Sequence, residues 1–108
     1  MEFRKITAII RQEMLEAVET RLQEMGVSGV TVSQVKGYGE YANFYTRDWL
    51  VKHVRIETFI GRARADEIVE GIMEAAHGSI PGDGIVAVQP VEKVYRIRTR
   101  AVVSPKYL

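Results

Sequence analysis

The sequence contains no cysteine and has almost no net charge, and both features narrow what the protein can be. Without cysteine there is no disulfide, no thiolate metal ligand and no cysteine nucleophile. The 15 basic and 14 acidic side chains leave a formal net charge of +1. Nothing in this overall charge predicts binding to nucleic acid or to an anionic membrane, so any anion-binding site must be local.

Long apolar runs are also missing. The first residues, "MEFRKITAII", are too short an apolar run for a signal peptide, and no apolar segment reaches the length that a membrane span needs. We therefore expect a cytoplasmic protein without membrane insertion. Its 108 residues, 46% of them hydrophobic, suffice for one core, so a single domain over 1–108 is expected.

The pattern of apolar residues repeats in the two halves of the chain. In the first half "FRKITAII" has the pattern of a strand, a helical stripe then ends at Gly26, and "VTVSQV" is again strand-like. In the second half "HVRIETFI", a stripe that ends near Gly78, and "IVAV" follow in the same order. This order predicts an α+β fold, a ferredoxin-like βαββαβ sandwich with a four-stranded antiparallel sheet and two helices on one face.

Such a sandwich leaves one face of its sheet without a helix. A face that carries Val, Ile and Phe is expected to be covered by another subunit or by a ligand. We therefore expect the chain to form an oligomer.

The segment between the halves, "GYGEYANFYTRDWL", is rich in aromatic residues. One interpretation is a functional loop over about 38–50 that contacts a partner, because a loop offers no core role for so many aromatic side chains. The other is a β-hairpin whose aromatics pack at a subunit boundary. The candidate partner-contacting residues are Tyr41, Phe44, Tyr45 and Trp49, together with Tyr38 at the start of the loop.

Two segments of the second half could bind phosphate. In "HGSIPGDGIVAV" the glycines either form a turn before a strand or let backbone amides approach a phosphate, while the aspartate orients a sugar or an amide. In "VEKVYRIRTR", which is predicted to be a strand, Arg96 and Arg98 share a face and could span a di- or triphosphate. An edge strand protected by charge is the simpler interpretation of these arginines.

Catalytic and metal-binding patterns are absent from the sequence. His53 and His77 are far apart, with no carboxylate at ligand spacing, so no metal site is expected and both are interpreted as surface or subunit-boundary residues. No pair of nucleophile and base stands out, and the protein is predicted not to be an enzyme.

Taken together, these segments resemble the P-II nitrogen-regulatory signal protein family. The resemblance is carried in order by "ITAIIR", "GVSGVTVSQVKGYG", "HVRIETFI", "AAHGSIPGDGIVAV" and "VEKVYRIRT", from about Lys5 to Thr99. It implies a homotrimer that binds an adenine nucleotide (ADP, AMP or ATP) between neighbouring subunits. It also implies signalling through the central loop to a partner protein such as a transporter or a metabolic enzyme. The closing strand and tail would cover about 91–108.

The resemblance also implies roles for individual residues. Backbone amides of Gly82, Asp83 and Gly84 would contact the phosphates, and Arg96 and Arg98 of an adjoining chain would neutralise them. The residues at the positions that hold adenine, lie near the ligand or form the base of the loop are Thr31, Phe59, Glu57, Gly37, Tyr38 and Gly39.

Several positions depart from the family pattern. Ile85 follows Gly-Asp-Gly where the family has a phosphate-binding lysine, so a weaker preference for triphosphate is expected. Glu40 and Tyr41 stand where the family has the Arg-Gln of Arg-Gln-Lys-Gly, whose Gln helps to hold magnesium and 2-oxoglutarate. We therefore expect no 2-oxoglutarate sensing and leave a role for magnesium open. The loop is also shorter than usual, and Tyr45 does not correspond to the family's modified tyrosine.

Three functional classes remain open from the sequence. The first is a non-enzymatic nucleotide sensor. The second is a trimeric adapter that has lost nucleotide binding or senses a small anion such as bicarbonate. The third, a nucleic-acid-binding ferredoxin-like domain, is disfavoured because the chain lacks both the aromatic motif of RNA-recognition domains and their basic charge.

Overall fold

The computed structural model describes residues 1–37, 51–78 and 82–105. Along the chain the elements are β1 (Phe3–Arg11), η1 (Gln12–Met14), α1 (Leu15–Glu24), β2 (Thr31–Gly37), β3 (Val51–Gly61), η2 (Arg62–Arg64), α2 (Ala65–Ala76), β4 (Gly84–Val91), β5 (Tyr95–Arg96) and β6 (Ala101–Val102). The strands and helices predicted in the two halves of the chain are confirmed by β1 to β4, α1 and α2.

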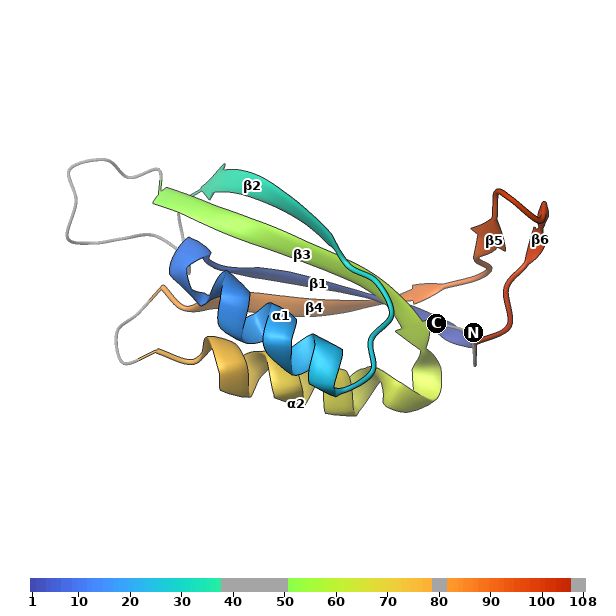
Figure 1. Ribbon diagram of the computed structural model, residues 1–108, viewed down its shortest axis with the longest axis horizontal. Coiled ribbons are helices and arrows are strands. Elements are labelled where there is room, and N and C mark those ends of the chain that lie inside the picture. The colour runs from blue at the N-terminus through green and yellow to red at the C-terminus, as the bar shows by residue number, and fades with distance from the viewer. Residues whose placement is uncertain (38–50, 79–81, 106–108) are drawn as a thin grey trace.

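The four long strands form one antiparallel sheet in the order β2-β3-β1-β4. Figure 1 shows α1 and α2 side by side on the same face of this sheet. The predicted ferredoxin-like α+β sandwich is therefore confirmed, and one face of the sheet carries no helix.

Alternation along the strands decides which side chains enter the core. On β1, Ile6, Ala8 and Ile10 are buried under the helices, and Val54, Ile56 and Ile60 of β3 lie on the same side of the sheet. The helices contribute Val18, Leu22, Ile68 and Ile72. Burial of each large aliphatic side chain stabilises the fold by about 1.5–3 kcal/mol, so this cluster fixes both helices on the sheet.

The end of α1 is held against the start of α2. Gly26 adopts a positive φ of 80°, which ends the helix as the sequence predicted, and the amide of Val27 bonds to the carbonyl of Leu22. The Arg64 guanidinium donates to the carbonyl oxygen of Met25 and to Glu67 Oε1. One arginine at the start of α2 therefore satisfies a carbonyl that the C-terminus of α1 leaves open.

The helix-free face is more polar than the sequence analysis anticipated. Opposed residues of β3 and β1 place the ionic side chains Lys5, Arg55 and Glu57 at its centre, next to exposed Phe59. Most large aliphatic residues of β1 and β3 point toward the helices. The helix-free face therefore carries mainly the residues that alternate with them along each strand.

The predicted closing strand is wrong in its extent. β5 covers only Tyr95–Arg96, the chain turns over 97–100, and β6 returns antiparallel to β5. The amide of Arg100 bonds to the carbonyl of Arg96 at 2.8 Å, and Arg100 has a φ of 58°. Arg98 therefore lies in a turn and does not share a strand face with Arg96.

The interpretation of His53 as a surface or boundary residue is also wrong for the single chain. Its side chain is only 1% exposed, and its neighbours across the strands are Val35 and Arg11. His77 is exposed, as expected.

Candidate functional site

The glycines before β4 have a structural reason that is independent of any ligand. Gly82 and Gly84 have φ values of 99° and 117°, which L-residues rarely adopt. A Cβ on Gly84 would lie 1.8 Å from the carbonyl oxygen of Ile9 on the neighbouring strand. The glycine at position 84 is therefore required by the close approach of β4 to β1.

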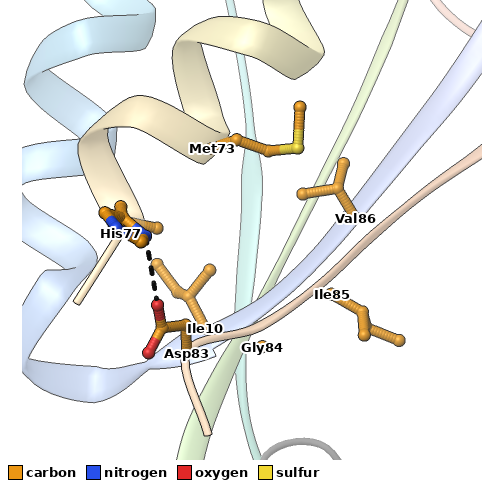
Figure 2. A pocket seen from close by; sticks show the side chains of 8 residues that line it. Ile10, Met73, His77, Asp83, Gly84, Ile85 and Val86 are labelled. Carbon is orange, nitrogen blue, oxygen red and sulfur yellow. Dashed lines mark ion pairs between the residues drawn. The ribbon is translucent and has the colours of Figure 1, made fainter. Parts of the chain in front are cut away.

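Asp83 joins the end of α2 to the start of β4. Its Oδ2 accepts a hydrogen bond from the amide of Gly78 at 2.8 Å and lies 3.4 Å from Nδ1 of His77 (Figure 2). Its Oδ1 is shielded from solvent and has no hydrogen-bond partner in the part of the chain that the structure describes. Within the chain, the group that Asp83 orients is the backbone amide of Gly78.

A cavity of about 210 Å³ lies beside this contact, and most of its lining is apolar. Figure 2 shows Met73 of α2 and Val86 of β4 on its helix side, whereas Ile85 points to the other side of β4. Ile85 is 42% exposed and lies opposite Ile9 on the helix-free face. The side chain at position 85, next to the glycines, is therefore apolar and exposed.

Glu57 is the centre of an ionic cluster on the helix-free face. Its carboxylate lies 2.7 Å from Nζ of Lys5 and 3.2 Å from Nε of Arg55. The hydrogen bond from Lys5 and the positive charges of both partners hold the pKa of the Glu57 carboxyl below its ordinary value, against an opposing effect of desolvation. Two cations around one anion leave this part of the face with a positive excess.

The residues expected near adenine lie on the β2 side of the sheet. Thr31 begins β2 opposite Glu57, and exposed Phe59 lies two residues further along β3. Thr58 donates a hydrogen bond to the carbonyl of Gly29 at 2.7 Å, which fixes the chain before β2. Strand pairing thus brings Thr31, Glu57 and Phe59 together. Gly37 ends β2, the strand that Thr31 begins.

The glycines and the arginines that were expected to share one phosphate are far apart within a chain. Gly84 begins β4, whereas Arg96 and Arg98 lie in the β5–β6 hairpin beyond its other end. Figure 1 shows this hairpin projecting past the far end of β4. The eight residues of β4 alone span roughly 25 Å. Gly37 and Gly84 also lie on opposite edge strands, about 14 Å apart across the sheet. A single chain therefore does not assemble these groups into one site.

Six candidate residues lie outside the described residues: Tyr38, Gly39, Tyr41, Phe44, Tyr45 and Trp49. Glu40, the other departure at the base of the loop, lies outside them as well.

Sequence reasoning missed Lys5, Arg55 and the contact of His77 with Asp83. Alternation could have placed Arg55 and Glu57 on one face of β3. The pairing of Lys5 with Glu57, however, depends on the register of two strands that are far apart in sequence.

Residues 1–37, 51–78 and 82–105 offer neither a metal-binding cluster nor a membrane-spanning helix. These residues hold no group of three His, Asp or Glu side chains that could bind a metal ion. They also hold no helix that is long and apolar enough to cross a membrane.

The fold and these positions define a class: a ferredoxin-like α+β protein with a glycine-rich entry to its last long strand and an arginine-bearing hairpin beyond it. A family model, Nitrogen regulatory protein P-II, matches residues 3–101. The chain belongs to this family, and the resemblance carried by its five sequence segments is confirmed.

Individual relatives agree with this assignment. The chain is 38% identical to the Nitrogen regulatory protein P-II of Azospirillum brasilense over 104 residues, which cover 89% of this chain and 92% of the relative. It is also 38% identical to the protein of that name from Cyanidium caldarium, over 91% and 93% of the two chains. The crystal structure of Arabidopsis thaliana PII bound to citrate superposes with a TM-score of 0.82 and 33% identity, covering 94% of this chain and 89% of that one.

Proposed function

We infer that the protein is a non-enzymatic signal-transduction protein that binds an adenine nucleotide between the subunits of a homotrimer. Its central loop, about 38–50, would regulate a partner transporter or metabolic enzyme in the cytoplasm. The observation that carries this proposal is the separation of the phosphate-binding candidates. The Gly82–Gly84 backbone and the arginines of the β5–β6 hairpin lie at opposite ends of β4, so they can meet at one ligand only if a second copy supplies one of them.

The chemistry of the two parts suits phosphate. Backbone amides at positive-φ glycines can approach an anion closely, and two exposed guanidinium groups can neutralise it without a high overall charge. The glycine segment supplies hydrogen-bond donors without a charge, and the arginines supply the positive charge.

The exposed surface of the chain supports assembly. The hairpin carries Tyr95 and Val102, which are more than half exposed, and Ile97, which is 94% exposed. Large apolar side chains on a projecting hairpin are typical of a contact with another subunit. The helix-free face, with Phe59 and Ile85 exposed, offers the second surface that such an assembly needs.

The test is calorimetric titration of the intact protein with ADP, AMP and ATP. Replacing both Arg96 and Arg98 with alanine should abolish binding, since each charge-assisted contact contributes about 1.5–3 kcal/mol. Arg62→Ala removes an exposed arginine beyond the end of β3 and should leave the affinity unchanged. If the double variant binds ADP as tightly as the wild type does, the assignment of the site is wrong.

A second candidate function follows from Ile85. Its exposed apolar side chain occupies the position of a phosphate-binding lysine, beside a largely apolar cavity. A trimeric adapter that has lost nucleotide binding, or that senses a small anion such as bicarbonate, fits this feature. Trimer formation without heat of binding for any of the three nucleotides would favour the adapter.

A further inference from the structure

The cavity at the end of α2 is lined by eight residues, of which only His77 and Asp83 ionise. His77 directly follows α2 and Asp83 directly precedes β4, and their side chains lie 3.4 Å apart. The dashed line in Figure 2 marks this contact. Asp83 also accepts the Gly78 amide, so its orientation depends on both contacts. The backbone that carries this aspartate is the Gly82–Gly84 segment whose amides are the proposed phosphate donors.

The charge of Asp83 is a problem for a phosphate site. A carboxylate within one residue of the donor amides repels a phosphate, and its Oδ1 has no hydrogen-bond partner among the described residues to disperse that charge. A protonated imidazole at His77 offsets the charge. His77 also caps the C-terminus of α2, where the helix dipole favours a positive charge.

The other ionic groups near His77 are already paired or point elsewhere. On α2, Glu74 is bound to Arg21 of α1 at 2.9 Å. The elements β1 and β4 contribute only Ile10, Ile85 and Val86 beside the glycine and the aspartate, and Arg11 lies on the helix-free side of β1. Residues 79–81 are Ser, Ile and Pro, which do not ionise near neutral pH. Among the residues that line the cavity, therefore, His77 is the one that can offset the charge of Asp83.

We propose that His77 is a positioning residue for the nucleotide phosphates, and that its protonation strengthens nucleotide binding. The proposal rests on the proposed function, because it takes the Gly82–Gly84 backbone as the phosphate-binding element. Because the imidazole lies 3.4 Å from Asp83, the protein would report acidification through the same site that reports the nucleotide.

The experiment measures the ADP affinity of the intact protein by calorimetry from about pH 5.5 to 8.5, for the wild type and His77→Gln. Protonation of ADP itself cancels in the ratio of the two dissociation constants. The wild type should bind about two- to fivefold more tightly than the variant at the acidic end, the range expected of an exposed ion pair, and equally at the alkaline end. Glu70→Gln, which removes an exposed charge from the same helix, should follow the wild type at every pH.

A second measurement follows the contacts of Asp83 with Gly78 and His77 in the absence of nucleotide. The backbone NMR signal of the Gly78 amide should shift with the protonation of His77, and the shift should be absent in Asp83→Asn. A pH-independent affinity ratio with intact ADP binding overturns the proposed role of His77 while the proposed function stands. If the Gly78 signal titrates but no nucleotide binds at any pH, both the proposed function and the coupling fail.

Discussion

At the residue scale, Gly84 shows how a position can serve both the fold and a ligand. We predict that Gly84→Ala is strongly destabilising, because its methyl group would lie 1.8 Å from the Ile9 carbonyl and its φ of 117° is strained for alanine. The expected loss in the free energy of unfolding exceeds about 2 kcal/mol, measured by urea denaturation at fixed protein concentration.

Gly29→Ala is the matched control for this substitution. A Cβ at Gly29 meets no atom within 4 Å, and its φ lies outside the left-handed region. Its effect should stay within about 0.5 kcal/mol. Similar losses for the two variants would contradict the steric argument, whereas the expected difference shows that the glycine of the motif is needed before any phosphate arrives.

At the element scale, the sequence predicted each strand and helix whose pattern repeats regularly, and it failed where the chain reverses without a turn residue. The alternation of "VEKVYRIRT" favours a strand, and no Gly, Pro, Asn or Asp marks the turn over 97–100. The reversal instead uses Arg100 at a φ of 58°, which is uncommon for a residue other than glycine. The role of Arg96 and Arg98 at the phosphates therefore stays a prediction, and the expected strand that would place both on one face is wrong.

The Glu57 cluster joins β1 to β3 and gives a prediction that depends on pH. Because the folded protein holds the pKa of Glu57 below its ordinary value of 4.5, the cluster stabilises the fold above that pH. Its contribution is lost as the pH falls through the lowered pKa. Glu57→Gln should therefore melt at a lower temperature than the wild type at pH 7, and this difference should shrink progressively below about pH 4.5, as thermal unfolding at a series of pH values will measure.

Glu16→Gln is the control for the Glu57 variant. Glu16 is exposed in the first turn of α1, on the other side of the sheet from the cluster. Its substitution should change the melting temperature little at any pH. A difference between Glu57→Gln and the wild type that persists unchanged at pH 3 would show that the ion pairs are not its cause.

At the scale of the whole molecule, both the sequence and the structure of the single chain favour assembly with further subunits. The helix-free face and the projecting hairpin both leave apolar side chains exposed, and the phosphate-binding candidates lie too far apart in one copy. Local patterns predicted that the face would lack a helix, but the positions of groups across a subunit boundary depend on contacts that no single-chain pattern records.

Two exposed residues of one strand test which face of the sheet is buried in the proposed trimer. Ile85 and Val88 of β4 are 42% and 44% exposed but lie on opposite faces, with Ile85 on the helix-free side. The wild type should have about three times the mass of the 12.2 kDa chain in multi-angle light scattering. Ile85→Glu should shift it toward a monomer, because an unpaired carboxylate buried between subunits costs several kcal/mol. Val88→Glu should remain trimeric. Assembly that survives Ile85→Glu but not Val88→Glu would place the subunit boundary on the helix side of β4 and contradict the proposed trimer.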